Sequence, residues 1–529
     1  MNSNRKYDVI IIGSGIGGLA LAAILAKMNR KKVLILERHF KMGGLTHEFE
    51  RKGKFTWDVG LHYVGEMAEG ELTRKIFDYL TDGKIKWNRM PSPFDIFIYP
   101  QLTFAVPDDE NKYKTDLIKL FPEEKKAIRQ YFIDIKKINS WLRRSYVKKI
   151  SPPPVNWMIS FLNYFAEAKA LMTTADYLNK NFKDSKLKAV LASQWGDYGL
   201  PPSQSAFATH CFIVYHYLKG GYYPEGGSQK IAQSIVPMIE AEGGRVLLNR
   251  EATQIIVKNN QAIGVEVNVR SGKEIQKETF YAPIIVSGIG ALNTYLELLP
   301  DPVAASFKEY LDPNCKFCSA VTVYIGFKED PRKLGFKGEN YWIFADYDHD
   351  KIIKQDILCK NYNAGFCYLS FPSLKNPSAK FHTAEIICLT TYDFFQKWKG
   401  QPWLKKEQDY HQLKERIAEA LIDLVEKHFK GFRALIEYKE ISTPLTLEHF
   451  TGRMKGSMYG LPATPGHYKS KWANVKTPIK NLYLTGSDVF FLGIVGAMMG
   501  GVATASVING PLGFFKIFQA AKILSTKNK

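Results

Sequence analysis

The chain has 529 residues, which is too long for one small hydrophobic core and predicts two interleaved domains. Hydrophobic residues make up 45% of it and charged residues 23%, which are the proportions of an ordinary folded protein and exclude a wholly disordered chain. The formal net charge of +20 indicates attraction to nucleic acid or to an anionic membrane face, or else a solvated basic surface without a specific partner. No helix-turn-helix, RNP or zinc-finger pattern is present, so nucleic acid is the disfavoured partner.

The first predicted elements form a strand–turn–helix–strand unit. An apolar strand at residues 7–12 runs into the glycine-rich turn at 13–18, and a segment rich in Ala and Leu follows as a helix. A second strand at residues 32–36 ends on Glu37. This order of elements is much more specific than the glycine spacing alone.

Each glycine of the turn has a separate physical role. Gly13 allows a sharp turn off the strand, Gly15 allows the backbone to approach a pyrophosphate, and Gly18 allows close helix–strand packing. The helix N-terminus offers free N–H groups to phosphate, and Glu37 can accept hydrogen bonds from ribose hydroxyls. The unit therefore predicts dinucleotide binding, and a βαβ unit without a ligand is the alternative.

The segment that follows Glu37 indicates which dinucleotide is bound. Gly43 and Gly44 stand directly behind it, and in flavoproteins with two dinucleotide-binding folds such a pair passes close to the flavin. A strand-to-turn step then brings Asp58, Gly60 and His62. These features favour FAD over NAD, and an ordinary surface turn at the two glycines is the alternative.

A different pattern begins near residue 87. A strand-like run at 94–99 precedes long helical stretches, among them a basic segment at 141–150 and an aromatic, apolar segment at 157–165. Basic residues beside Trp, Phe and Leu suit a helix that lies in a lipid interface. A core helix reached through a proline turn is the equal alternative.

The nucleotide-domain pattern returns near residue 223. A helix at 229–242 is followed by alternating strands, and the apolar run at 284–288 resembles a buried strand that ends at a ligand site. The last strand, at 482–485, leads to a second glycine-rich helix start at 493–501. The amphipathic tail at 513–524 either rests on lipid or caps the fold.

These patterns predict an α/β fold in which a Rossmann-like, two-dinucleotide-binding FAD domain is interleaved with an α+β substrate domain. The FAD domain is assigned to residues 1–90, 221–305 and 472–510. The substrate domain takes 91–220 and 306–471, and residues 511–529 form the amphipathic C-terminal tail.

Cysteine usage and hydropathy bear on location. The six cysteines have no disulfide-scaffold spacing, and the single CxxC of Cys315 and Cys318 has no second pair, so no metal site is expected. Buried thiols in a reducing compartment are the better interpretation. The N-terminus has no apolar signal segment, and no uncharged apolar run is long enough to span a bilayer. We expect a cytoplasmic protein that associates peripherally with membranes.

Four longer motifs carry a resemblance to a known family. The chain resembles the retinol saturase family, within the phytoene desaturase and carotenoid isomerase group of FAD enzymes, whose fold is amine-oxidase-like. The motifs are Asp-Val-Gly-Leu-His-Tyr-Val-Gly at 58–65, Trp-Gly-Asp-Tyr-Gly-Leu-Pro-Pro at 195–202, Gly-Gly-Tyr-Tyr-Pro-Glu-Gly-Gly at 220–227, and Asn-Leu-Tyr-Leu-Thr-Gly-Ser-Asp-Val-Phe at 481–490.

The resemblance implies an FAD site along the glycine-rich segments, with Glu37 on the adenosine ribose and the second glycine-rich helix start near the flavin ring. The predicted cofactor contacts are Gly13, Ser14, Gly15, Ile16, Gly17, Gly18, Glu37, Arg38, Gly43, Gly44, Leu45, Thr46, Asp58, Gly60, Leu61, His62, Ala252, Thr253, Ser287, Gly288, Gly486, Ser487, Asp488, Ile494, Val495 and Gly496.

The chemistry implied is hydride transfer between the flavin and a carbon–carbon double bond of an apolar isoprenoid or polyene. Reduction of that bond needs an acid, and His62, Tyr63, Tyr215 and His216 are the candidates beside elements predicted to approach the flavin. A carotenoid desaturase or cis–trans isomerase is the first alternative. NADPH is the candidate external electron donor, and a redox partner protein is the other.

A non-catalytic lipid carrier of the Rab escort or GDP-dissociation-inhibitor type is the alternative from another class. Such carriers resemble the fold yet hold prenyl groups. The complete set of cofactor residues in this chain argues against a carrier, because a carrier needs no flavin site.

Overall fold

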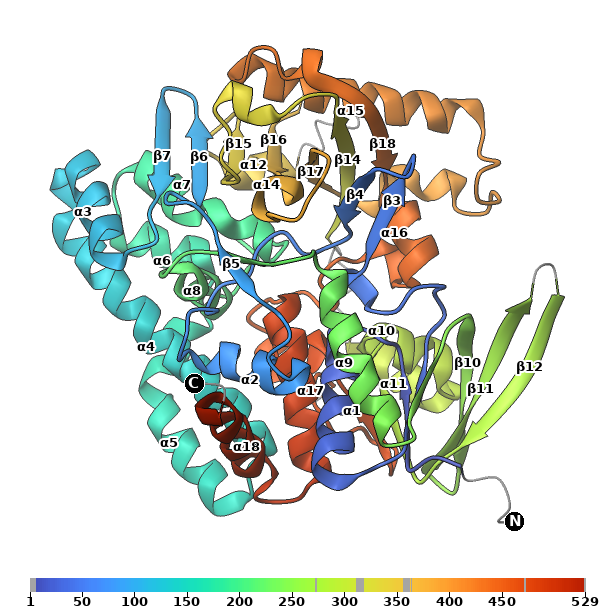
Figure 1. Ribbon diagram of the computed structural model, residues 1–529. Coiled ribbons are helices and arrows are strands. Elements are labelled where there is room, and N and C mark those ends of the chain that lie inside the picture. The colour runs from blue at the N-terminus through green and yellow to red at the C-terminus, as the bar shows by residue number, and fades with distance from the viewer. Residues whose placement is uncertain are drawn as a thin grey trace.

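The computed structural model describes residues 6–271, 274–310, 318–354, 362, 364–470 and 472–527 (Figure 1). Two larger sheets organise this part of the chain, a parallel one of five strands and a mixed one of seven. Cys315 and Cys359 lie outside the described residues, whereas Cys211, Cys367 and Cys388 are buried.

The five-stranded sheet has the order β19-β13-β1-β2-β9, and all neighbouring strands in it are parallel. Its strands are β1 (Val9–Ile12), β2 (Val33–Leu36), β9 (Arg245–Leu247), β13 (Ile284–Ser287) and β19 (Leu482–Leu484). Every residue of β1 and β2 is buried, since both faces of this sheet are covered. That double burial is why these strands are continuously apolar in the sequence.

Alternate residues of β1 enter two different cores. Val9 and Ile11 pack with the helices α1 (Ile16–Asn29), α9 (Gln229–Ala241) and α17 (Gly493–Ile508). Ile10 and Ile12 pack on the other face, against an antiparallel three-stranded sheet. That sheet consists of β10 (Arg250–Lys258), β11 (Gln261–Ser271) and β12 (Glu274–Tyr281).

The seven-stranded sheet has the order β18-β14-β17-β16-β15-β6-β7. Its strands are β6 (Asp95–Tyr99), β7 (Leu102–Val106), β14 (Ser319–Phe327), β15 (Asn340–Phe344), β16 (Phe366–Ser370), β17 (Thr383–Thr390) and β18 (Ile436–Ser442). Only the β15–β6 pair is parallel. This pairing joins a strand from the first quarter of the chain to strands from its second half.

A layer of helices lies on the left of Figure 1. It is built from α3 (Glu110–Leu120), α4 (Lys125–Ile150), α5 (Pro153–Ala170), α6 (Thr174–Asn181), α7 (Ser185–Ala192) and α8 (Phe207–Tyr217). The architecture confirms the predicted α/β class. The predicted domain boundaries, which divide the chain between the two sheets, remain a prediction.

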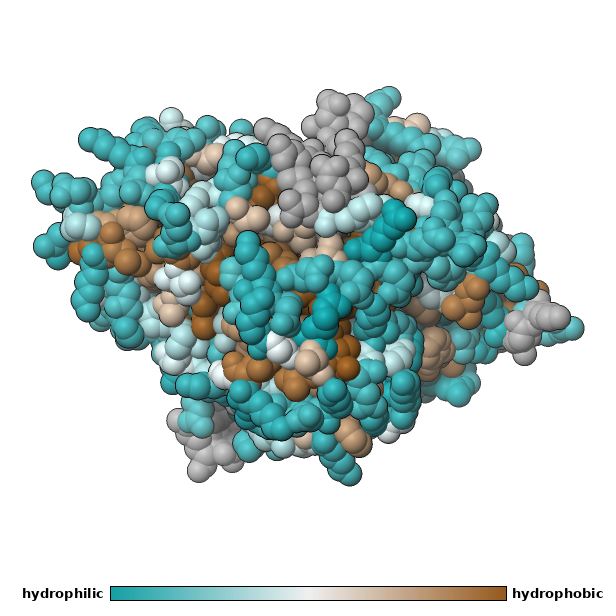
Figure 2. All heavy atoms as spheres, turned by 90° about the horizontal axis from the view of Figure 1, so that it is seen from above, coloured by the Kyte–Doolittle hydropathy of each residue, from teal (hydrophilic) through white to brown (hydrophobic). Residues whose placement is uncertain are grey.

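Helix α5 decides between the two interpretations of its aromatic sequence. Only Ile159, Asn163 and Ala170 of this helix are buried, so it is not a core helix. Trp157, Phe161 and Phe165 recur every four residues and are 71, 71 and 82% exposed. The helix, which lies at the lower left of Figure 1, therefore presents an apolar face to the outside of the protein. Figure 2 shows the opposite end, over the seven-stranded sheet, where hydrophilic side chains dominate and hydrophobic ones lie between them.

The tail forms α18 (Gly513–Lys527), which packs against α17 and against α2 (Leu72–Thr81). Ile517 and Ala521 are buried in this contact, whereas Phe515 is exposed. One face of the tail helix thus packs against the rest of the protein. Among the described residues, no helix is both long enough and apolar enough to cross a membrane.

Candidate cofactor and active site

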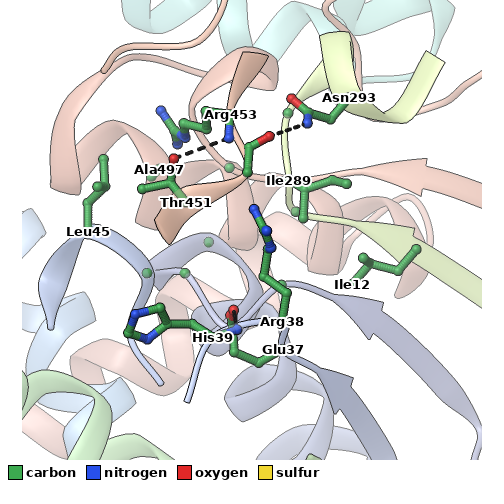
Figure 3. Close-up of a pocket in the computed structure, with 18 of the residues that line it drawn as sticks. Ile12, Glu37, Arg38, His39, Leu45, Ile289, Asn293, Thr451, Arg453 and Ala497 are labelled. Carbon is green, nitrogen blue, oxygen red and sulfur yellow. Dashed lines mark hydrogen bonds between the residues drawn. The ribbon is translucent and has the colours of Figure 1, made fainter. Parts of the chain in front are cut away.

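A cavity opens at the carboxyl ends of the parallel strands, where the loops that follow β1, β2, β13 and β19 converge. This is the edge at which open α/β sheets bind ligands. Figure 3 shows Glu37 and Arg38 on one side of the cavity and Arg453 on the opposite side. Leu45 lies at a third side, away from Ile12.

The glycines of the first turn have the distinct roles that their positions predict. Gly13 has a φ of +94°, a left-handed conformation that other residues rarely adopt. A Cβ on Gly15 would meet no heavy atom within 4 Å, so this position faces open space in the cavity. A Cβ on Gly18 would overlap the carbonyl oxygen of Gly13, so its absence allows helix and strand to pack closely.

Two long helices point their N-termini at the cavity. Helix α1 has Gly15 as its N-cap, and Gly15, Ile16 and Gly17 line the cavity. Helix α17 starts at Gly493, which also lines the cavity together with Ile494. The free N–H groups and positive dipole ends of both helices favour an anion such as a pyrophosphate between them.

The Glu37 side chain is held at the end of β2. The backbone N–H and the hydroxyl of Ser14 donate to its Oε2, at 2.8 and 2.6 Å, and the N–H of His39 donates to Oε1. Ser14 does not itself line the cavity. It orients the carboxylate that we predict to accept hydrogen bonds from a ribose.

The diglycine crosses directly over the first turn. A Cβ on Gly44 would lie 2.9 Å from the Cα of Gly15, so the two segments approach as closely as backbones allow. The Ser14 hydroxyl accepts a hydrogen bond from the N–H of Gly43 at 3.1 Å. Leu45 then packs on Gly60, and both line the end of the cavity away from Glu37.

Most predicted cofactor contacts line this cavity. They are Gly13, Gly15, Ile16, Gly17, Glu37, Arg38, Gly43, Gly44, Leu45, Thr46, Gly60, Ala252, Gly288, Gly486, Ser487 and Ile494. The remaining predicted contacts do not line it. They are Ser14, Gly18, Asp58, Leu61, His62, Thr253, Ser287, Asp488, Val495 and Gly496.

Asp488 faces away from the cavity, in contrast to the predicted direct contact. Its carboxylate accepts hydrogen bonds from the N–H of Ala291 at 2.7 Å and of Leu461 at 3.0 Å. It therefore ties together two loops of the cavity wall. Asp58 is buried and does not line the cavity; its carboxylate accepts a 2.5 Å hydrogen bond from the Tyr223 hydroxyl.

None of the four predicted acids lines the cavity, and Tyr215 and His216 have partners elsewhere. The N–H of Gly65 donates to His216 Nε2 at 2.8 Å, and His216 Nδ1 lies 3.2 Å from a carboxylate oxygen of Glu66. The ring of Tyr215 stacks under the guanidinium of Arg143. Neither residue lines the cavity, and both have structural partners.

Several cavity residues were missed by the sequence analysis. Phe450, Arg453 and Tyr459 come from α16 (Pro444–Thr451) and the loop after it. Gly452, Gly456 and Gly460 recur there every four residues, all with positive φ. That spacing was the one local signal of a tightly turning loop at a ligand site.

A buried polar cluster lies near Tyr459, which lines the cavity and whose hydroxyl donates to the carbonyl of Gly196, the residue before Asp197. The Tyr63 hydroxyl lies 3.1 Å from Asp95 Oδ2 and 2.8 Å from Asp197 Oδ2. Asp95 also accepts hydrogen bonds from Gln194 Nε2 at 3.0 Å and from Asn340 Nδ2 at 2.9 Å. Burial raises the pKa of Asp95 to about 6 and that of Asp197 further above its ordinary value.

A buried lysine connects this cluster to His62. Lys375 Nζ donates to Asn340 Oδ1 at 2.5 Å, to Ser370 Oγ at 2.7 Å and to the carbonyl of His62 at 2.9 Å. Burial lowers the pKa of Lys375 to about 8. His62 Nδ1 in turn lies 2.9 Å from Oε2 of the fully buried Glu385. His62 thus reaches the site only through its neighbours.

The cavity has the features that FAD requires. Gly15 leaves space that a Cβ would fill, the N-termini of two helices line the cavity, and Glu37 is oriented at one end. The other end is walled by Leu45, Gly60 and Tyr459.

Comparison with known proteins agrees with this interpretation. The family model of flavin-containing amine oxidoreductases matches residues 16–509. An all-trans-retinol 13,14-reductase of Danio rerio is 31% identical, covering 99% of this chain and 89% of that protein. The prolycopene isomerase 2 of an Oncidium hybrid cultivar is 26% identical, covering 97% and 85%.

The solved structures show the same fold. The cyclohexylamine oxidase of Brevibacterium oxydans superposes with a TM-score of 0.58 at 16% identity, covering 98% of this chain and 99% of that one. The match to a family of flavin-containing enzymes confirms the predicted flavin cofactor, FAD. The chain belongs to the family of flavin-containing amine oxidoreductases and, within it, to the branch of the all-trans-retinol 13,14-reductases.

Proposed function

We propose that the protein reduces a carbon–carbon double bond of an apolar polyene or isoprenoid, as the names of its reductase relatives state for them. The observation that supports reduction most directly is the buried acidic cluster of Tyr63, Asp95 and Asp197 beside the cavity. Saturation of a double bond requires a proton as well as a hydride, and this cluster is a proton source next to the cofactor site.

FAD, held by the residues that line the cavity, supplies the hydride chemistry at its N5 atom. The protein residues would bind and orient it: Glu37 would accept hydrogen bonds from the ribose, and the N-termini of α1 and α17 would hold the pyrophosphate. Tyr459 and Leu45 wall off the flavin end, which excludes water from the reacting carbons. Of the four predicted acids, Tyr63 is the one that contacts the acidic cluster, and the His62 ring contacts Glu385.

Isomerisation is the second candidate function, because prolycopene isomerases are also similar to this chain. A lipid carrier without flavin chemistry is disfavoured by the cavity, whose open space at Gly15 and oriented Glu37 a carrier would not need.

The test is an anaerobic incubation of the holoenzyme with dithionite and all-trans-retinol, read by mass spectrometry and flavin absorbance. A product two hydrogens heavier, with reoxidised flavin, supports reduction. An isomer of unchanged mass would support isomerisation, and flavin that stays reduced in the presence of both retinol and a carotenoid would contradict the proposal.

The electron donor is proposed to be NADPH, with a redox protein as the alternative. Rapid mixing of NADPH with the oxidised holoenzyme should bleach the flavin absorbance. A flavin that NADPH leaves oxidised, but that dithionite reduces, would favour a redox protein as the donor.

We also propose that the protein docks on an anionic membrane through α5, which suits a substrate drawn from lipid. Residues 153–166 of α5 carry no charge, and Trp157, Phe161 and Phe165 form its outward aromatic row. Such an amphipathic surface buries its apolar side chains at the boundary between headgroups and acyl chains.

Lysines flank this helix. A cavity of about 830 Å³ between α4, α5 and the segment at 468–476 is lined by Lys148, Lys149, Lys469 and Lys476, with Glu167 as its one acidic residue. Each lysine near an anionic surface contributes about 1 kcal/mol to membrane attraction at low salt. Trp157, Phe161 and Phe165 do not line this cavity, so the lysines flank the aromatic row and do not belong to it.

Co-sedimentation with phosphatidylserine-containing vesicles tests the docking surface. Trp157→Ser and Phe161→Ser should each weaken binding roughly tenfold, because each removes an aromatic side chain worth about 1.5–3 kcal/mol on burial. Leu404→Ser is the matched control, since Leu404 is 81% exposed on a different part of the protein. Equal binding of all variants, or no binding by the wild type at low salt, would contradict docking through α5.

A further inference from the structure

The hydrogen bonds around Tyr63 leave one proton to be assigned. Its hydroxyl oxygen contacts two carboxylate oxygens, Asp95 Oδ2 at 3.1 Å and Asp197 Oδ2 at 2.8 Å. Both contacts need a hydrogen, and a tyrosine hydroxyl supplies only one. One of the two aspartates must therefore carry the second proton.

The surroundings assign that proton to Asp197. Asp95 is fully buried and accepts hydrogen bonds from Gln194 and Asn340 in addition to its contact with Tyr63, so its negative charge is stabilised by amide donors. For Asp197, the described part of the chain provides no hydrogen bond to its carboxyl group other than the one with Tyr63. Two carboxyls that share one partner cannot both ionise cheaply, and the one with fewer hydrogen-bond donors stays protonated.

Asp197 is the better placed of the two aspartates to pass this proton to a substrate. Asp197 is half-buried, whereas Asp95 has no exposed surface. Tyr459, which lines the flavin end of the cavity, donates a hydrogen bond to the carbonyl of Gly196, the residue before Asp197, at 2.9 Å. Asp197 also lies close enough to the Tyr459 hydroxyl that its ionised form would raise the pKa of Tyr459.

We infer that Asp197 is the acid that protonates the substrate, and that Asp95 and Lys375 are positioning residues that set its protonation. This inference rests on the proposed reduction of a double bond. One carbon of that bond accepts a hydride from the reduced flavin, and the other accepts the Asp197 proton. Asp197 is left as a carboxylate, takes up a proton from water, and an external two-electron donor of the nicotinamide class restores the flavin.

Charges around Asp197 act on it in opposite directions. Burial is the main cause of its raised pKa, the charge of Asp95 raises that pKa further, and the charge of Lys375 lowers it. The other titratable groups that interact with Asp197 are Tyr63, Tyr198, Tyr217, Tyr368 and Tyr459. All five have raised pKa values and remain neutral near pH 7.

The first test needs no substrate. Infrared titration of the holoenzyme should show the carbonyl stretch of a protonated carboxyl group near neutral pH. Asp197→Asn should remove the Asp197 component of that band, Tyr63→Phe should shift this component, and Asp116→Asn on α3, whose carboxylate pairs with Lys112, should leave it unchanged. Absence of the band from the wild type would overturn the assignment.

The second test uses single-turnover reduction of the polyene across pH. Asp197→Asn should lower the rate roughly 10²- to 10⁴-fold. The rate should fall as pH rises through the pKa of Asp197, so Asp95→Asn should move this fall to lower pH and Lys375→Met should move it to higher pH. A merely structural role would not give opposite shifts, and wild-type rates in Asp197→Asn would overturn the inference.

The two tests separate this inference from the proposed function. A wild type that shows the carboxyl band yet reduces no double bond would contradict the proposed reduction, while supporting the assignment of the shared proton to Asp197.

Discussion

Replacement of Gly15 by alanine should separate cofactor binding from folding. Its backbone angles, φ −60° and ψ 165°, suit any amino acid, and a Cβ there meets no protein atom within 4 Å. The free energy of unfolding of the apoprotein should therefore change by less than about 0.5 kcal/mol. The methyl group would enter the space through which the backbone approaches the pyrophosphate. An overlap of this size costs about 1–3 kcal/mol, so FAD affinity should fall roughly 5- to 150-fold.

Gly18→Ala is the matched control, because it adds the same methyl group three residues later. Its Cβ would overlap the carbonyl oxygen of Gly13 and lie 3.2 Å from Cγ2 of Ile11. The added volume is confined between α1 and β1, so the apoprotein itself should lose about 1–3 kcal/mol of stability.

Urea unfolding of the apoproteins and titration with FAD, followed by quenching of flavin fluorescence, measure the two quantities separately. We expect a stable Gly15→Ala protein that binds FAD weakly. Wild-type FAD affinity in Gly15→Ala would refute the placement of the pyrophosphate at this turn, and an unfolded Gly15→Ala apoprotein would refute the open space seen beside it.

Two further predictions concern buried histidines. His216→Gln should lower stability but leave the pH profile of polyene reduction unchanged, since His216 bonds Gly65 and Glu66 and does not face the cavity. Burial raises the pKa of Glu66, but the hydrogen bond and charge of His216 lower it below its usual 4.5. The stability that Glu66 contributes is thus present above about pH 4.5 and is lost as pH falls through its lower folded-state pKa. Below that pKa, the free energies of unfolding of Glu66→Gln and the wild type, measured in urea, should converge. A shifted pH profile in His216→Gln would show that His216 acts in catalysis. Burial lowers the pKa of His349 from 6.5 to about 4, so the wild type should lose up to roughly 3 kcal/mol as pH falls between these values. His349→Gln should remove that part of the pH dependence of unfolding, and an unchanged pH dependence would mean that His349 is not held neutral.

Local sequence was sufficient to predict the first βαβ unit. The roles of Gly13, Gly15 and Gly18 follow from backbone geometry within one turn, and Glu37 follows from the length of one strand. These features depend on neighbours within about thirty residues, so they can be recognised before the fold is known.

Sequence patterns could not determine the direction of individual side chains. Asp488 stands in a predicted cofactor loop, yet its carboxylate bonds two backbone N–H groups behind the cavity wall. The aromatic row of α5 is equally compatible with a core or an interface, and only the packing of neighbouring helices left it exposed.

The acidic cluster depended entirely on the tertiary structure. Asp95, Asp197 and Lys375 lie in three separate segments that meet only because β6 pairs with β15 and the 3-10 helix at Ser193–Asp197 packs beside them. Their protonation depends on burial and on each other's charges, which are properties of the assembled core and not of any one segment. The sequence by itself determined which cofactor the protein binds, because short backbone turns recognise that cofactor. Only the tertiary structure decided which group holds the proton, because this depends on charged residues that lie far apart in the sequence.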